Sequence, residues 1–267
     1  MKRSYLAASI AAIAGAVNFD LEIPDISDGK PELHIVYPDN INTNLVRISR
    51  DEYPMAFRWP ERSPRCGATM ITPQVALTAA HCVYRYEDNS NNLNNLDVVL
   101  TDGDGNLTTY DIVDIRANNC WWSEANSGWT RQMAADIAFL ILDRPIENAV
   151  EGKHYVKVWD EDEGSIVGRQ FTLAGWGASG EIRDDGSENH LDTEMEVFHR
   201  GYNVVDSISD NMLNYSMQSP DNGGLELESM GHNGDSGSGA FIIDENGDHR
   251  LVGVKSNGQD AFWGSKH

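Results

Sequence analysis

The chain has 267 residues, of which 40% are hydrophobic, so it is long enough for one large or two small domains with a buried core. Its formal net charge is −22, which argues against nucleic acids and anionic membranes as partners, because both attract basic surfaces. The negative charge does not identify a substrate, because a well-solvated surface of a secreted protein can be negative without any role in binding.

The first forty residues predict a segment separate from the folded domain. A positively charged start precedes an apolar run from Leu6 to Val17 that is too short to span a bilayer, and Ala14-Gly15-Ala16 fits a small-x-small cleavage site. This pattern predicts a secretory signal peptide over residues 1–16, the alternatives being an N-terminal anchor or a buried helix. Residues 17–40 are acidic and lack periodicity, which predicts a propeptide or a loosely packed arm.

Residues 41–267 predict one all-β domain. From Tyr53 onward, short apolar runs alternate with turn signals, which is typical of a barrel or sandwich of many short strands. In the first half, strands are expected at Gly67–Ile71, Val75–Thr78, Leu96–Leu100, Tyr110–Ile115 and the run that follows Asp136. The third and fourth of these are expected to pair across the turn-rich segment 102–106.

That turn also raises the alternative of a calcium site, because Asp102, Asp104 and Asn106 place oxygen-bearing side chains at alternate positions. The EF-hand pattern fails, since its glycine position falls on Leu107 and its closing glutamate position on Val113. A hairpin turn is the preferred interpretation, and no metal or other cofactor is expected.

A charged connector at Val156–Ser165 is expected to join two halves, at about 41–160 and 161–267. The second half opens on a predicted core strand at Phe171–Gly177.

Three motifs carry the chemistry. The string Gly234-Asp235-Ser236-Gly237-Ser238 predicts a tight turn that presents a hydroxyl and leaves N–H groups pointing at one spot. A serine hydroxyl is a weak nucleophile, so it needs a base, and the base needs an orienting acid. His81, within Thr78–Cys82, and Asp136, within Asp136–Leu140, can supply these groups. Taken singly, the motifs are also compatible with a surface turn, a packed histidine and a strand-end cap.

In this order and these contexts, the motifs resemble the chymotrypsin/trypsin-like serine proteases over residues 53–258. The resemblance implies two six-stranded antiparallel Greek-key barrels with a cleft between them. The second barrel is expected to be incomplete, because few residues follow Gly258. The implied activity is that of a secreted, extracellular, monomeric serine endopeptidase, made as a zymogen. It would hydrolyse protein or peptide substrates through an acyl-enzyme, and protein inhibitors would be further partners.

The resemblance assigns roles to individual residues. His81 is the general base, Asp136 orients it, and Ser236 is the nucleophile. The N–H groups of Gly234 and Ser236 form the oxyanion hole, and Ser256 supports the aspartate.

The resemblance also pairs Cys66 with Cys82 in a disulfide beside the histidine. Cys120 is left over, and it is either buried and inert, exposed and reactive, or missing a partner. Asn106-Leu107-Thr108 and Asn214-Tyr215-Ser216 are glycosylation sequons, which matter only if the host modifies secreted proteins.

Met230, Lys255, Ser256 and Gly258 are implied to line the substrate pocket. Trypsin relatives carry an aspartate six residues before the nucleophile, and that position is Met230 here unless an insertion shifts the alignment. Lys255 either faces the pocket, favouring an acidic residue before the scissile bond, or reaches solvent.

The family's activation step has no clear counterpart in the sequence. In relatives, the residue at Asp235 pairs with an N-terminal ammonium released by cleavage, but the usual Ile-Val-Gly-Gly start is absent. Cleavage before Ile35 or Ile41 is the hypothesis. The unusual start and short end keep a second function open, that of a non-catalytic homologue that binds a protein or regulates another protease.

Overall fold

A computed structural model of the chain describes residues 57–59, 62–87, 97–101, 107–117, 135–152, 154–175, 177, 179–182, 188–192, 199–209, 211–216, 218, 224–225, 228–231 and 234–256. Several sequence predictions lie outside the described residues: the signal peptide and arm at 1–40, the cleavage positions Ile35 and Ile41, the turn 102–106, Cys120 and Gly258.

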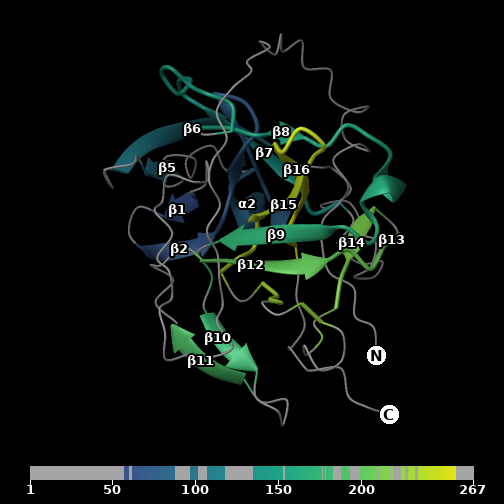
Figure 1. Cartoon of the computed structure of the whole chain (residues 1–267). Coiled ribbons are helices and arrows are strands. Elements are labelled where there is room, and N and C mark those ends of the chain that lie inside the picture. Colours follow the sequence, from purple (N-terminus) through teal and green to yellow (C-terminus); the bar gives the residue numbers. More distant parts are fainter. Residues whose placement is uncertain are drawn as a thin grey trace.

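A curled antiparallel sheet forms the first half of the described chain (Figure 1). It contains seven strands, in the order β2 (Arg62–Cys66), β1 (Phe57–Trp59), β5 (Asp97–Thr101), β6 (Leu107–Ala117), β7 (Ala138–Leu142), β4 (Val75–Thr78) and β3 (Thr69–Met70). The predicted pairing of β5 with β6 is confirmed, with Val98 opposite Tyr110.

Hydrophobic alternation sets the register of the longest strand. In β6, Tyr110 and Ile112 are buried while Asp111 and Val113 are exposed, because successive side chains of a strand point to opposite faces. A bulge after Ile112 shifts the pairing with β7, and Ile115 is again buried on the core side.

The second half is built on a five-stranded sheet, in the order β12 (His199–Val204), β9 (Gln170–Gly175), β15 (Gly239–Ile243), β16 (His249–Val254) and β8 (Lys157–Val158). Its strands pair antiparallel except β16 with β8, which is parallel. Two hairpins are separate from it: β10 (Ser179–Ile182) with β11 (Glu188–Asp192), and β13 (Ser207–Ser209) with β14 (Met212–Asn214).

The curled sheets confirm the predicted all-β, double-barrel fold class. Within the described residues, the two sheets contain seven and five strands, where six and six were expected. In the part of the chain that the structure describes, two short helical segments accompany the sheets, α2 (Ala80–Glu87) and the 3₁₀ helix η2 (Glu163–Ile166). No helix in the described part of the chain has the length and apolar character needed to cross a membrane.

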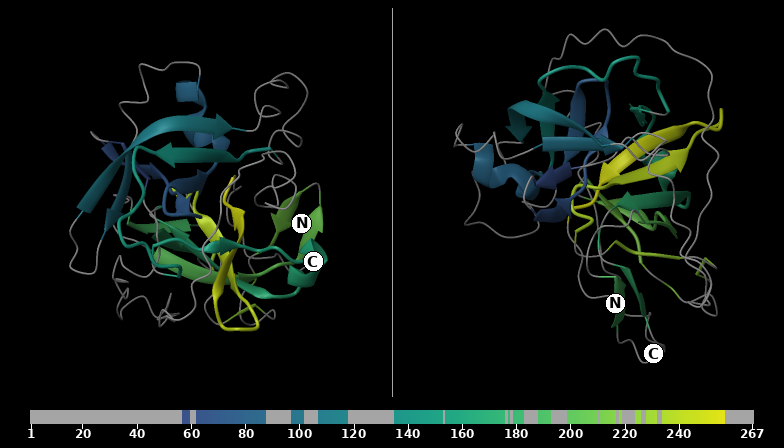
Figure 2. Two further views of the ribbon diagram at one scale, coloured as in Figure 1. Left: turned by 90° about the horizontal axis from the view of Figure 1, so that it is seen from above. Right: turned by 90° about the vertical axis from the view of Figure 1, so that its left-hand side faces the viewer.

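The two halves lie against each other, with the first sheet in blue and teal beside the green and yellow strands of the second (Figure 2). Backbone hydrogen bonds join them directly. The Val156 N–H donates to the Met70 carbonyl at 3.0 Å, and the Gly67 N–H donates to the Ser236 carbonyl at 2.7 Å. Each half therefore fixes the position of loops that belong to the other.

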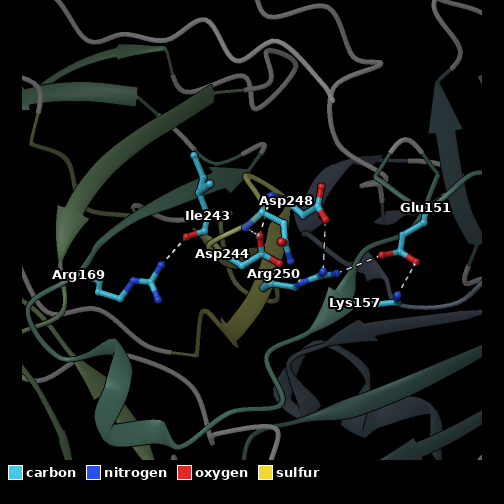
Figure 3. A network of polar contacts seen from close by, with 8 residues as sticks. Glu151, Lys157, Arg169, Ile243, Asp244, Asp248 and Arg250 are labelled. Carbon is cyan, nitrogen blue, oxygen red and sulfur yellow. Dashed lines mark hydrogen bonds and ion pairs between the residues drawn. The ribbon is translucent and has the colours of Figure 1, made fainter. Parts of the chain in front are cut away.

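A charged network ties the β15–β16 turn to the segment that links the halves (Figure 3). The Arg250 guanidinium contacts the carboxylates of Asp244 at 2.8 Å and Glu151 at 3.1 Å, and Lys157 contacts Glu151 at 3.2 Å. The side chains of Arg250, Asp244 and Glu151 are only 14%, 10% and 12% exposed. Loss of one partner would leave charges with little access to water.

We therefore expect Arg250→Met to lower the free energy of unfolding by about 2–3 kcal/mol, because removing one member of a largely buried ionic network leaves the others uncompensated. Arg116→Met is the matched control, since its ion pair with Asp114 is about half exposed and is worth less than about 1 kcal/mol. Urea unfolding of both variants measures the difference. Equal, small effects would show that the network does not stabilise the fold.

The same network predicts a pH dependence. Burial by itself raises the pKa of Asp244, but the N–H groups of Asp248 and Asn246 together with the Arg250 guanidinium lower this pKa below its ordinary value of 3.8. A carboxyl whose pKa is lower in the folded state stabilises the fold above its unfolded pKa, and this contribution disappears as the pH falls through the folded pKa. Unfolding curves of wild type and Asp244→Asn should therefore differ at about pH 5 and converge towards pH 2. A difference that stays constant over this range would contradict the assignment.

Candidate active site

His81 and Asp136 meet at the edge of the first sheet. His81 lies in the first turn of α2, directly after β4, and Asp136 lies two residues before β7, which pairs with β4. The His81 Nδ1 atom is 2.6 Å from Asp136 Oδ2. Because a carboxylate oxygen can only accept, Nδ1 carries the proton in this bond, and the lone pair of the ring is left on Nε2. This tautomer can accept a proton from a hydroxyl.

The Asp136 carboxylate also holds the backbone of the histidine. Its Oδ1 accepts the His81 N–H at 2.7 Å. That N–H is in the first turn of α2 and has no partner within the helix, so Asp136 acts as a helix cap supplied from a distant part of the sequence. The Asp136 side chain thus fixes both the ring and the main chain of His81.

A third donor reaches the same carboxylate from the second half of the chain. Ser256, directly after β16, donates its hydroxyl to Asp136 Oδ2. Asp136 is 1% exposed, and burial of an unpaired carboxylate would be strongly unfavourable. Three hydrogen bonds compensate for that burial, and the one from Ser256 joins the two halves beside the histidine.

A disulfide between Cys66 and Cys82 lies next to the imidazole. His81 Nε2 is 3.8 Å from the Cys82 sulfur. Cys66, Cys82 and His81 are close enough together to suggest a metal site, but the disulfide uses both thiols and leaves a single imidazole nitrogen as a ligand. The disulfide is suited to holding His81 in position, because Cys82 is the next residue in the chain.

The turn that carries Ser236 is docked against the first sheet by glycines. Gly237 has φ +80°, and a side chain there would lie 2.2 Å from both the Gly67 carbonyl and the Thr78 hydroxyl. Thr78 in turn donates its hydroxyl to the Gly67 carbonyl at 2.7 Å. Gly67 therefore contacts the turn at Ser236 and at the two residues that follow it. Gly67 is also adjacent to Cys66, whose disulfide partner is the neighbour of His81. These contacts hold the Ser236 turn against the segment that the disulfide links to the neighbour of His81.

Two N–H groups of this turn are candidates for an anion site. Gly234 has φ +97°, a conformation that side chains disfavour. Neither Gly234 nor Ser236 uses its N–H in a hydrogen bond to another described residue, and the same holds for the Ser236 hydroxyl. Hydrogen bonds of a nucleophile are often long before a substrate binds.

The predicted pocket residues have different environments. Met230 is partly buried against the core, and Ser256 is bound to Asp136. Lys255 is 4% exposed, so the alternative in which its ammonium reaches solvent is wrong. Its side chain lies against Gly231, where a Cβ atom would be 2.4 Å from Nζ.

The sequon at Asn214 is also buried. Asn214 is 5% exposed, and its amide nitrogen donates to Ser209 Oγ at 3.0 Å and to the Met212 carbonyl at 3.1 Å. A glycan on this amide would displace those bonds, so this sequon is not an acceptor in the folded protein.

Sequence reasoning missed the contacts of Asp235 with the end of β9. Asp235 Oδ1 accepts the Gly177 N–H at 2.7 Å, and a side chain at Gly175 or Gly177 would overlap this carboxylate. Glycines at a strand end do indicate close approach, but the sequence does not say which segment approaches.

Comparison with known proteins agrees with this arrangement. A protein-family profile described as Trypsin matches residues 46–264. A "Venom serine protease" of Polistes dominula is 27% identical over 143 residues, which is 50% of this chain and 48% of that protein. The chain thus spans about half the length of this curated relative.

The docking of the turn predicts unequal effects of two glycine substitutions. Gly168 and Gly237 have almost the same φ, +81° and +80°, but a Cβ atom at Gly168 would contact nothing within 4 Å. Gly168→Ala should cost about 1 kcal/mol from backbone strain alone. Gly237→Ala should cost at least about 3 kcal/mol, because strain and overlap add. Chemical denaturation of both variants measures the two losses of unfolding free energy. Equal losses would exclude the close contact of Gly237 with Gly67 and Thr78.

Proposed function

Because the chain belongs to the trypsin family of serine proteases, we propose that it is a secreted serine endopeptidase whose catalytic residues are His81, Asp136 and Ser236. The observation that carries the proposal is the Nδ1-to-carboxylate bond of 2.6 Å, since it leaves His81 Nε2 as the base that a serine nucleophile requires.

In the proposed reaction, Ser236 Oγ attacks the carbonyl carbon of the scissile peptide bond while His81 Nε2 takes the hydroxyl proton. The Asp136 carboxylate stabilises the resulting imidazolium. The C–N bond then breaks, and His81 delivers the proton to the leaving amine. Water, deprotonated by His81, hydrolyses the acyl-enzyme and restores the serine.

The N–H groups of Gly234 and Ser236 are the proposed donors to the negative oxygen of the tetrahedral intermediates. Each such donor lowers a barrier by about 3 kcal/mol in related chemistry. The positive φ of Gly234 supports this role, because the peptide turns there in a way that only glycine readily allows.

Secretion and protein substrates belong to the same proposal. The expected signal peptide and the Cys66–Cys82 disulfide both fit an oxidising compartment. Peptide chains are the substrates that a trypsin-like protease hydrolyses, and protein inhibitors would bind the same site.

A fluorophosphonate probe tests the proposal, because it labels only an activated serine. Wild type should be labelled at one serine, and Ser236→Ala should abolish the labelling. His81→Ala should slow the labelling by at least about 10³-fold, as removal of the general base does in well-studied serine proteases. Ser238→Ala is the matched control, since it removes a hydroxyl from the same turn and should leave the labelling in place. Absence of labelling in the wild type, before and after proteolytic trimming, would favour the non-catalytic homologue instead.

A further inference from the structure

The Glu228 carboxylate binds the main chain of a segment that precedes the Ser236 turn. Its Oε2 atom accepts the Leu225 N–H at 2.8 Å, and its Oε1 atom accepts the Gln218 N–H. The backbone of Gly224 lies against the same group, since a Cβ atom there would be 2.9 Å from Glu228 Oε2 and 2.2 Å from the Gln218 carbonyl oxygen. One carboxylate thus holds together residues that lie up to ten positions before it in the chain.

The residue that follows Glu228 is held on β12. The Ser229 N–H donates to the Tyr202 carbonyl at 2.7 Å, and the Asn203 side-chain amide donates to the Ser229 carbonyl at 3.0 Å. Ser229 is 8% exposed, and its hydroxyl lies against Gly201, where a Cβ atom would be only 1.7 Å from Oγ. Two consecutive residues are therefore fixed, Glu228 through its side chain and Ser229 through both of its main-chain groups.

This segment, residues 228–231, reaches the candidate active site through Gly231. The Lys255 side chain packs on Gly231, where a Cβ atom would be 2.5 Å from Lys255 Cδ. The Lys255 carbonyl in turn accepts the N–H of Gly237, the neighbour of Ser236, at 2.7 Å. Met230, which the family resemblance implies to line the substrate pocket, lies between these fixed points. Its position relative to the nucleophile therefore depends on how the 228–231 segment is held.

The contacts also assign different roles to three consecutive residues. The resemblance puts Met230 at the position where trypsin relatives carry an aspartate, and Glu228 is the nearest preceding acidic residue. Each oxygen of the Glu228 carboxylate accepts a main-chain N–H, and the Ser229 side chain is buried against β12. The contacts of Glu228 are thus made within its own chain, with two donors of the kind that bind a carboxylate strongly.

We propose that Glu228 is a positioning residue for substrate binding, which holds the 228–231 segment at the pocket and does not itself bind a basic side chain of the substrate. The inference rests on the proposed function. It implies that peptides with Lys or Arg before the scissile bond are not the preferred substrates, because the one nearby carboxylate is occupied by main-chain donors.

The experiment compares Glu228→Gln with Glu161→Gln in the full chain, before and after proteolytic trimming. Glutamine keeps the shape of the side chain but replaces one acceptor oxygen with an amide nitrogen, which cannot accept an N–H. Glu161 is exposed, so Glu161→Gln removes the same charge at a solvated position. For each protein, kcat and KM are measured on peptides that differ in the residue before the scissile bond. The labelling rate with a small alkyl fluorophosphonate and the urea unfolding curve are measured in parallel.

Glu228→Gln should raise KM by about 10-fold for peptides of every charge, because loss of one hydrogen bond to a charged group loosens the 228–231 segment. The value of kcat and the labelling rate should stay near those of wild type, since the small probe reacts with Ser236 without filling the pocket. Glu161→Gln should behave as wild type in every measurement.

Amide hydrogen exchange tests the contacts independently of activity. The N–H groups of Gln218 and Leu225 should exchange slowly in wild type and faster in Glu228→Gln, and the Ser229 N–H should become less protected with them. Glu161→Gln should leave all three protected. Equal exchange in Glu228→Gln and wild type would show that Glu228 does not hold the segment.

Three activity results would overturn the inference while leaving the proposed function intact. Glu228→Gln could lose cleavage after Lys and Arg alone, which would show that this carboxylate binds the substrate. It could keep the wild-type KM for every peptide. It could lose labelling and stability in urea together, which would indicate a general structural role. If wild type is never labelled, the proposed function fails, and the exchange measurement still decides whether Glu228 holds the segment.

Discussion

The buried carboxylate of Asp136 is the constraint on which the site depends. It accepts three hydrogen bonds, two from His81 and one from Ser256, and these donors come from both halves of the chain. A carboxylate that is 1% exposed is tolerated only with such partners, so folding and orientation of the imidazole are coupled. The same interaction that satisfies the buried charge also selects the tautomer that the proposed reaction requires.

The serine is positioned by a different principle. Its turn approaches the first sheet closely, with Gly67 and Gly237 at the contact and the Thr78 hydroxyl beside both glycines. The disulfide from Cys66 to Cys82 then links this contact to His81. Close packing of backbone against backbone leaves the Ser236 turn little freedom to move. The proposed attack of Ser236 on a carbonyl carbon requires such a precise position. Behind the turn, the buried Lys255 is bonded through its backbone to Gly237 and Ser238.

Much of this arrangement follows from the sequence. The alternation of apolar residues predicts the strands, and the glycine-flanked Ser236 predicts a tight turn. What the sequence does not predict is which partner a buried polar group finds. Lys255 could have reached solvent or substrate, but it is buried with its side chain against Gly231, which is distant in sequence. The short helix α2 was also not expected, because its stability depends on the tertiary cap from Asp136 rather than on its own residues.

Asp136 holds His81 in the Nδ1–H tautomer, so that Nε2 can accept a proton. The most direct test is an NMR spectrum of the full chain with ¹⁵N-labelled histidine, in which the His81 signals are assigned by their loss in His81→Gln. We expect a strongly deshielded proton on Nδ1 and an unprotonated Nε2, and we expect Asp136→Ala to lose that proton signal. A His81 ring with its proton on Nε2, or one whose signals do not change in Asp136→Ala, would contradict it.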